Sequence, residues 1–259
     1  MLALSEIKKQ YPENIRKFER FIFREYLQYK ILQIVFKSES ANRLSFLGGT
    51  CLRIVYGNRR FSEDIDFDNF NLSIKEFDKI AALISTELSK EGYETEVRTV
   101  HKGAYHCYIK FPELLYSEGL SGFKEEKILI QLDTEPQHFS FEPEKIILNK
   151  FDVFTQINTT PLDILLAQKF YAILNRKRNK GRDFFDVVFL LSLVKSPNYD
   201  YLQQKIKVNS PEKLKEKILQ KCASIDMQEM ANDVAPFLFD TTDLNKVTLF
   251  PEYLKQEKL

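Results

Sequence analysis

The stretch that decides the fold is FLGGTCLRIVYGNRRFSEDIDFDNF, residues 46–70. An apolar strand leads into a Gly48–Gly49 turn, and residues 50–57 then have the composition of a short helix with Thr50 as its N-cap. Residues 61–70 alternate through their centre, which predicts a second strand. The pattern therefore places a strand, a glycine turn, a short helix and an acidic strand in succession.

Three aspartates alternate along the second strand. Because residues i, i+2 and i+4 of a strand share one face, Asp64, Asp66 and Asp68 are expected to point the same way, with Ile65 and Phe67 toward the core. Carboxylates about 7 Å apart repel each other unless a cation lies between them, and Mg²⁺ accepts such oxygens while leaving positions for substrate phosphates. A solvent-facing acidic strand that discourages aggregation is the alternative.

The two glycines add to this interpretation. Gly48 and Gly49 allow the backbone to approach a ligand and to present N–H groups to a phosphate. A lone Gly-Gly pair is also compatible with an ordinary strand–helix turn. A phosphate-binding turn followed by a metal-binding strand is a rarer combination, and it meets the needs of a nucleoside triphosphate.

Composition limits the remaining choices. The chain has 259 residues, of which 44% are hydrophobic, with only 8 Gly and 9 Pro, so a disordered or low-complexity class is excluded. The 38 basic and 37 acidic residues nearly cancel, so any nucleic-acid binding must come from a local patch. The three cysteines and three histidines lack zinc-site spacing, and we expect the histidines to be peripheral. No apolar run reaches about 18 residues, so we expect a cytoplasmic protein without a membrane span.

Periodicity along the chain predicts its organisation. Helices are expected over 13–36 and 73–92, the second opened by a Ser73–Glu76 capping box and closed by Gly92. Further strands are expected at 93–100, 104–111, 126–133 and 145–154. From Thr160 onward the pattern is helical. We therefore predict an α+β fold, with a mixed β-sheet core and flanking helices in residues 1–155 and an α-helical part in residues 156–259.

The helical part contains a lysine among apolar residues. On a helical wheel Lys169 falls in a stripe with Leu162, Leu165, Leu166 and Ile173. A lysine placed there must extend to solvent or meet an anion, such as a triphosphate or a carboxylate. Residues 176–182, RKRNKGR, hold five basic residues in seven and are either a solvated loop or a contact for triphosphate or RNA backbone.

Two aspartates follow this basic segment. Asp183 stands at a predicted helix start, so an N-cap role is an alternative to a functional one. Asp186 lies four residues from Arg182 and could pair with it.

Two segments resemble one known family. The succession of GGT, Leu52, Tyr56, Gly57, Arg59 or Arg60, and S-x-D-I-D-F resembles the opening signature of the nucleotidyltransferase superfamily, in the version carried by AbiEii/AbiGii-type toxins. Residues 160–192 resemble that family's later motifs, a helix with a characteristic lysine followed by a basic loop and R-D-x-x-D. These toxins belong to bacterial type IV abortive-infection toxin–antitoxin pairs. Gly49–Thr50 replaces the glycine–serine pair of the wider superfamily.

The resemblance implies a nucleotidyltransferase-like fold whose helical part completes the active-site cleft. It implies Mg²⁺, with Mn²⁺ as an alternative, held by Asp64, Asp66 and Asp133. Asp133 ends the strand ILIQLD as the third carboxylate, with Glu135 as a substitute and a strand-ending turn aspartate as the alternative. The catalytic set is Asp64, Asp66, Asp133, Lys169 and Asp183. The nucleotide-binding set is Gly48, Gly49, Thr50, Lys169, Arg182 and Asp186, with the choice between Asp183 and Asp186 left open.

The implied activity is transfer of a nucleoside monophosphate from an NTP to an RNA acceptor, with the 3′ end of tRNA as the favoured site and with growth arrest and phage defence as the effect. A cognate antitoxin encoded alongside is implied, although the pair need not form a stable complex. A transferase that modifies an aminoglycoside-like small molecule or a protein is the runner-up. A catalytically idle module that holds NTP or RNA is the third reading, and the clustered carboxylates argue against it.

Overall fold

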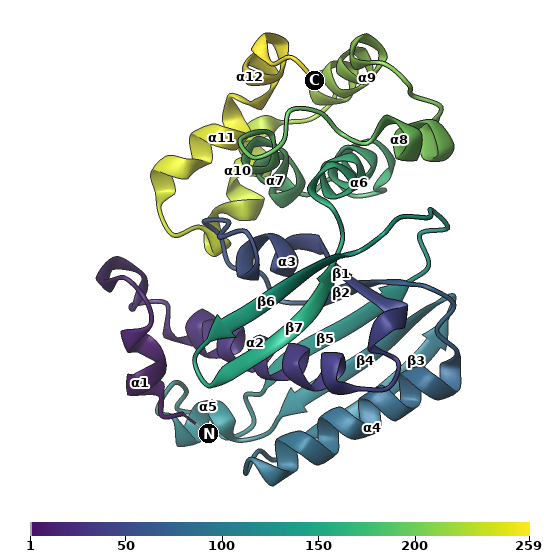
Figure 1. The fold of residues 1–259 in the computed structure, drawn as a ribbon. Coiled ribbons are helices and arrows are strands. Elements are labelled where there is room, and N and C mark those ends of the chain that lie inside the picture. Colours follow the sequence, from purple (N-terminus) through teal and green to yellow (C-terminus); the bar gives the residue numbers. More distant parts are fainter. Residues whose placement is uncertain (1) are drawn as a thin grey trace. The chain divides into compact units, whose positions relative to one another are not determined.

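A computed structural model describes residues 2–259 of the chain. These residues form two compact units (Figure 1). The first takes in the described residues up to Gly57 together with Phe61–Thr160, and the second takes in Asn58–Arg60 together with Pro161–Leu259. The short segment Asn58–Arg60 joins the helical unit through a bridge between Arg60 and Leu238, a contact that nothing in the sequence pattern signals.

The first unit is built on a seven-stranded mixed sheet with strand order β3-β4-β5-β2-β1-β7-β6. β1 is antiparallel to β2 and parallel to β7, while β2 is parallel to β5. This sheet and its flanking helices confirm the predicted α+β class. The strands are β1 (Leu44–Leu47), β2 (Ile65–Asn69), β3 (Glu96–Lys102), β4 (Ala104–Phe111), β5 (Ile128–Glu135), β6 (Glu144–Lys150) and β7 (Val153–Thr159).

Two helices cover the apolar side of this sheet. α2 (Glu19–Lys37) packs against β7, α4 (Ile74–Lys90) packs against β3, and the two helices contact each other. Strand alternation buries Ile65, Phe67 and Leu132 in the core. The intervening polar residues of the central strands point to the opposite face, where the candidate site lies. Shorter helices are α1 (Leu4–Lys9), α3 (Gly48–Ile54) and α5 (Leu114–Ser117).

The predicted elements agree with the structure in part. The capping box is confirmed, since the Ser73 hydroxyl accepts from the Glu76 N–H at 3.3 Å and the Glu76 carboxylate accepts from the Ser73 N–H at 2.9 Å. The helix expected over 13–36 begins only at Glu19, because Phe18 has a non-helical ψ of 50° and Ile15 is buried from a separate 3-10 turn. The strand expected over 145–154 is a hairpin of β6 and β7, because Phe151 turns the chain with φ of +59°.

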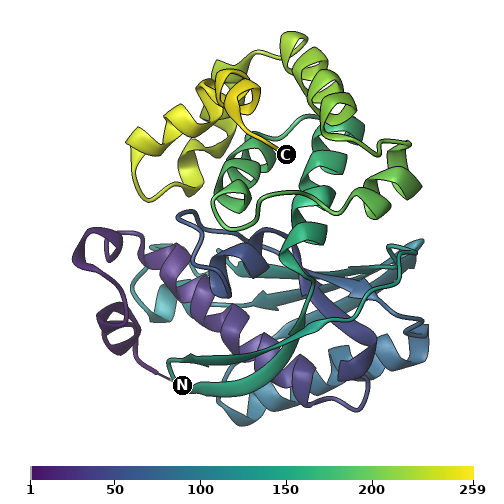
Figure 2. The same cartoon turned by 45° about the horizontal axis from the view of Figure 1, so that its top comes forward.

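The second unit is helical. α6 (Leu162–Asn175) and α7 (Gly181–Leu191) lie side by side (Figures 1 and 2). Gly181 allows α10 (Met227–Val234) to approach α7 closely, because a Cβ atom on Gly181 would come within 1.7 Å of the Met230 carbonyl oxygen. The other helices are α8 (Tyr199–Ile206), α9 (Pro211–Ala223), α10 (Met227–Val234), α11 (Asn245–Thr248) and α12 (Phe250–Gln256). Among residues 2–259 we find no helix with the length and apolar character needed to cross a bilayer.

Candidate active site

The glycine turn and the acidic strand meet in the α/β unit. Gly48 follows β1 with φ of +79°, and a Cβ atom on it would come within 2.4 Å of Asp66 Oδ2. Both the left-handed backbone conformation and the close approach of the Asp66 side chain therefore favour glycine at this position. The Asp66 carboxylate lies directly against the backbone of the turn, which brings a negative side chain and the candidate phosphate-binding loop together.

Thr50 fixes the same turn from inside the helix. α3 begins at Gly48 with Leu47 as its N-cap residue, so the prediction that Thr50 caps the helix is wrong. The buried Thr50 hydroxyl donates to the carbonyl oxygen of Asp64, so this side chain ties α3 to the residue that leads into β2.

A buried ion cluster anchors the other end of α3. Arg53 Nε donates to Glu25 Oε2 on α2 at 2.7 Å, and the Glu25 carboxylate also accepts from Tyr11 and Lys150. Burial alone would raise the pKa of Glu25, but the charges of Arg53 and Lys150 bring it below its usual value. The ionised Glu25 thus holds α3, and with it the glycine turn, against α2.

The three alternating aspartates differ in environment. Asp64 and Asp66 are half-buried, whereas Asp68 is 1% exposed. The Asp68 carboxylate accepts from the backbone N–H of Asn69 at 2.7 Å and of Gln137 at 2.9 Å. Asp68 therefore stabilises the chain around the end of β2, whereas Asp64 and Asp66 keep part of their surface exposed on the polar face of the sheet.

Asp133 lies beside Asp66 in the sheet. The two are register partners across the parallel strands β2 and β5, and His106 on β4 is the register partner of Asp133 on its other side. His106 Nδ1 lies 2.7 Å from Asp133 Oδ1, and Gln131 Nε2 donates to both carboxylate oxygens at 2.9 Å. Because an ionised carboxylate only accepts, the His106 Nδ1–H donates to it.

The expectation that the histidines are peripheral is therefore wrong for His106. The alternation of residues 104–111 places His106 on the polar face of β4, but only the pairing of β4 with β5 brings it to Asp133. That pairing joins residues 27 positions apart, and no local pattern encodes it. Glu135, the proposed substitute for Asp133, is exposed and is the register partner of Asp68.

The donor set of this unit suits a hard cation. No cluster of three or more His, Cys, Asp or Glu side chains ready to hold a metal occurs among residues 2–259. A Mg²⁺ ion bound by one or two carboxylates and completed by substrate phosphates does not require such a cluster. Asp64 and Asp66 fit that mode. Asp133 already accepts from Gln131 and His106 and retains acceptor capacity as a further ligand.

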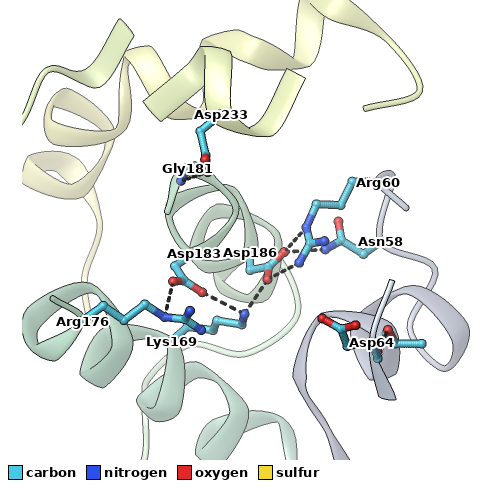
Figure 3. Close-up of polar contacts among 10 residues, drawn as sticks. Asn58, Arg60, Asp64, Lys169, Arg176, Gly181, Asp183, Asp186 and Asp233 are labelled. Carbon is cyan, nitrogen blue, oxygen red and sulfur yellow. Dashed lines mark hydrogen bonds and ion pairs between the residues drawn. The ribbon is translucent and has the colours of Figure 1, made fainter. Parts of the chain in front are cut away.

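The helical unit holds a second polar cluster, centred on Lys169 (Figure 3). Its ammonium lies 3.0 Å from Asp183 Oδ1 and 2.7 Å from Asp186 Oδ2. The predicted position of Lys169 among apolar residues of α6 agrees with its side-chain exposure of 12%. The anions that Lys169 meets in this structure are these two carboxylates of α7.

Asp186 is fully buried and multiply bound. Arg60 donates to it through Nε at 2.7 Å and Nη2 at 2.6 Å, and Asn58 donates at 2.9 Å (Figure 3). Burial alone would raise the pKa of Asp186, but Arg60 and Lys169 lower it to about 2. The alternative pairing of Asp186 with Arg182 is wrong, because the cations that bind its carboxylate are Arg60 and Lys169.

Asp183 is at the third position of α7, after Gly181 and Arg182, and the N-cap residue is Lys180. The alternative of an N-cap role for Asp183 is therefore wrong. Instead Asp183 Oδ2 lies 3.0 Å from Arg176 Nε of the basic segment, and Oδ1 faces Lys169 (Figure 3). Arg182 forms no ion pair with any residue in the described part of the chain.

Comparison with known proteins identifies the family. Residues 30–252 match the family described as the nucleotidyl transferase AbiEii toxin of type IV toxin–antitoxin systems. The chain belongs to the AbiEii family. No curated protein sequence matches this AbiEii-family chain.

Two solved structures share the fold of this AbiEii-family chain. JHP933 from Helicobacter pylori is 15% identical with a TM-score of 0.54, and the alignment covers 91% of this chain and 92% of that one. The second structure, a candidate nucleotidyltransferase from H. pylori, is 14% identical with a TM-score of 0.55. The alignment covers 91% of this chain and 95% of that one. At such identities these likenesses show the fold alone.

Proposed function

We propose that this AbiEii-family chain is a Mg²⁺-dependent toxin that transfers a nucleoside monophosphate from an NTP to an RNA acceptor, with the 3′ end of tRNA as the favoured site. The observation that supports this most is the contact of Asp66 with the Gly48 turn. It puts a carboxylate that can bind a cation beside backbone N–H groups that can bind a phosphate. A triphosphate with its metal requires both.

The α/β residues have distinct roles in this proposal. Asp64 and Asp66 hold Mg²⁺, or Mn²⁺ in its place, and the metal when bound neutralises charge on the triphosphate. Gly48, Gly49 and Thr50 form the loop that accommodates the phosphates. Asp133, oriented by His106 and Gln131, accepts the proton of the attacking 3′-hydroxyl. The hydroxyl oxygen bonds to the α-phosphorus, the α–β bridging bond breaks, and pyrophosphate leaves.

The helical unit contributes positive charge. We assign Lys169 and Arg182 to the phosphates of the nucleotide, and Asp183 and Asp186 to the orientation of Lys169. The contacts of Lys169 with both carboxylates support the second assignment. Arg60 adds to it by fixing Asp186. A cognate antitoxin that regulates the shared operon completes the proposal, and a stable complex between the two is not required.

Induced expression in a bacterial host tests the proposal. The wild type should arrest growth, and Asp64→Ala should abolish the arrest because the metal pair is lost. Asp78→Ala, an aspartate of α4 outside the site, is the matched control and should remain toxic. Full toxicity of Asp64→Ala would contradict nucleotidyl transfer and favour an idle NTP- or RNA-binding module. Arrest that depends on Asp64 with unmodified RNA would favour a small-molecule or protein acceptor.

A further inference from the structure

A basic depression of 680 Å³ lies in the helical unit, where the ends of α6 and α8 meet α9. Four lysines line it: Lys205, Lys207, Lys217 and Lys221. No aspartate or glutamate is among its lining residues, although the chain as a whole has 37 acidic residues. The depression is therefore a local concentration of positive charge in a nearly neutral protein.

The fold holds these lysines together. Lys217 and Lys221 are four residues apart on α9, so they share one face of the helix, while Leu214, Ile218 and Cys222 are buried. Lys207 ends α8 in the left-handed conformation, with φ of +58°. Like charges four residues apart on one helix face repel each other slightly, so Lys217 and Lys221 do not stabilise α9 as a pair.

Three of the four lysines of this depression are not neutralised by an internal ion pair. Lys207, Lys217 and Lys221 form no ion pair with any residue between 2 and 259. Other lysines of the same unit do form them, such as Lys246 with Asp243 at 2.9 Å. Asn175 lines the depression and directly precedes the basic segment 176–182, whose exposed Lys177 and Arg178 continue the positive charge along the chain.

We infer that this depression binds the phosphate backbone of the RNA acceptor. The inference rests on the proposed function and adds a binding surface that the reaction itself does not use. A polyanion with regularly spaced phosphates fits a wide, open, lysine-lined hollow better than a single small anion does. Lysine acts as a point charge without base-specific hydrogen bonding, so this surface positions RNA without selecting a sequence.

Fluorescence anisotropy with labelled total tRNA, in the absence of NTP and divalent cations, tests the inference. Lys217→Glu/Lys221→Glu should raise the Kd at least about tenfold at 0.1 M salt, and should lower the slope of log Kd against log salt by about 1.5. The matched control is Lys213→Glu/Lys215→Glu, which makes the same charge change on α9 outside the depression. The control should bind close to the wild type. Circular dichroism of each variant verifies folding.

Three results with tRNA alone would overturn the inference. They are unchanged binding by the Lys217/Lys221 variant, equal weakening by both double variants, which would indicate net charge alone, and absence of tRNA binding by the wild type. Polyglutamate that binds through the same lysines, while tRNA binding is unaffected by them, would overturn it in favour of an acidic protein partner. Failure of the proposed function would be distinguishable from failure of this inference. In that case tRNA would still bind through these lysines, but no nucleotide would be transferred to it.

Discussion

His106 Nδ1 lies 2.7 Å from Asp133 Oδ1, across the antiparallel pair of β4 and β5. The contact extends the polar row that begins with Asp66 on β2. Asp133 is therefore held on two sides, by the imidazole and by the Gln131 amide. A carboxylate held in this way is oriented before a substrate arrives, which is what proton acceptance from a bound hydroxyl requires.

His106→Ala should lower kcat for nucleotide transfer about 10- to 100-fold, because Asp133 loses the partner that orients it. The KM for NTP should change little, since His106 does not touch the phosphate loop. Steady-state kinetics measure both quantities. His101→Ala, which removes a β3 histidine bound to Asp78, is the matched control and should keep the wild-type kcat. Equal kcat for the wild type and His106→Ala would contradict the positioning role.

Gly48→Ala should disrupt both stability and activity. The added Cβ would have to occupy a left-handed backbone conformation and would clash with the Asp66 carboxylate. Gly103 has a similar φ of +76° with open space around it, so Gly103→Ala isolates the cost of the conformation alone, about 1–2 kcal/mol. Urea unfolding should show a larger loss for Gly48→Ala. Equal losses for the two variants would mean that Asp66 does not pack against the turn.

Asp186→Asn should lower the free energy of unfolding by about 3–5 kcal/mol at pH 7, because Arg60 and Lys169 lose a buried anionic partner. The folded-state pKa of Asp186 is about 2, below its ordinary value of 3.8. Ionised Asp186 therefore stabilises the fold above about pH 4, and that stabilisation is lost as the pH falls toward 2.

The difference in the free energy of unfolding between the wild type and Asp186→Asn should accordingly become smaller as the pH falls from 4 to 2. Denaturant unfolding at several pH values measures it. A difference in the free energy of unfolding that stays constant down to pH 2 would show that Asp186 is not held ionised by its partners.

Local sequence patterns account for much of the fold. Alternation of Ile65 and Phe67 with aspartates predicts the orientation of β2, and the Ser73–Glu76 box predicts the start of α4. The stripe of α6 likewise places Lys169 away from open solvent. Each of these signals lies within one helix or one strand, so the local sequence is sufficient to predict it.

Contacts between distant residues could not be predicted in this way. The pairing of Arg60 with Asp186 joins residues 126 apart, and it moves Asn58–Arg60 into the helical unit. The contact of His106 with Asp133 depends on strand register, which no single strand specifies. The turn at Phe151 lacks the glycine or asparagine that usually marks a left-handed residue, so one strand was expected where β6 and β7 form a hairpin.

Direct detection of the reaction tests the central claim. Purified protein is incubated with Mg²⁺, total tRNA and each α-³²P-labelled NTP in turn, beside Asp66→Asn and the control Asp78→Asn. We predict labelled tRNA with at least one NTP for the wild type and Asp78→Asn, and none for Asp66→Asn. Label of equal intensity with Asp66→Asn, or no label with any NTP although the wild type binds nucleotide, would contradict nucleotidyl transfer to RNA at this site.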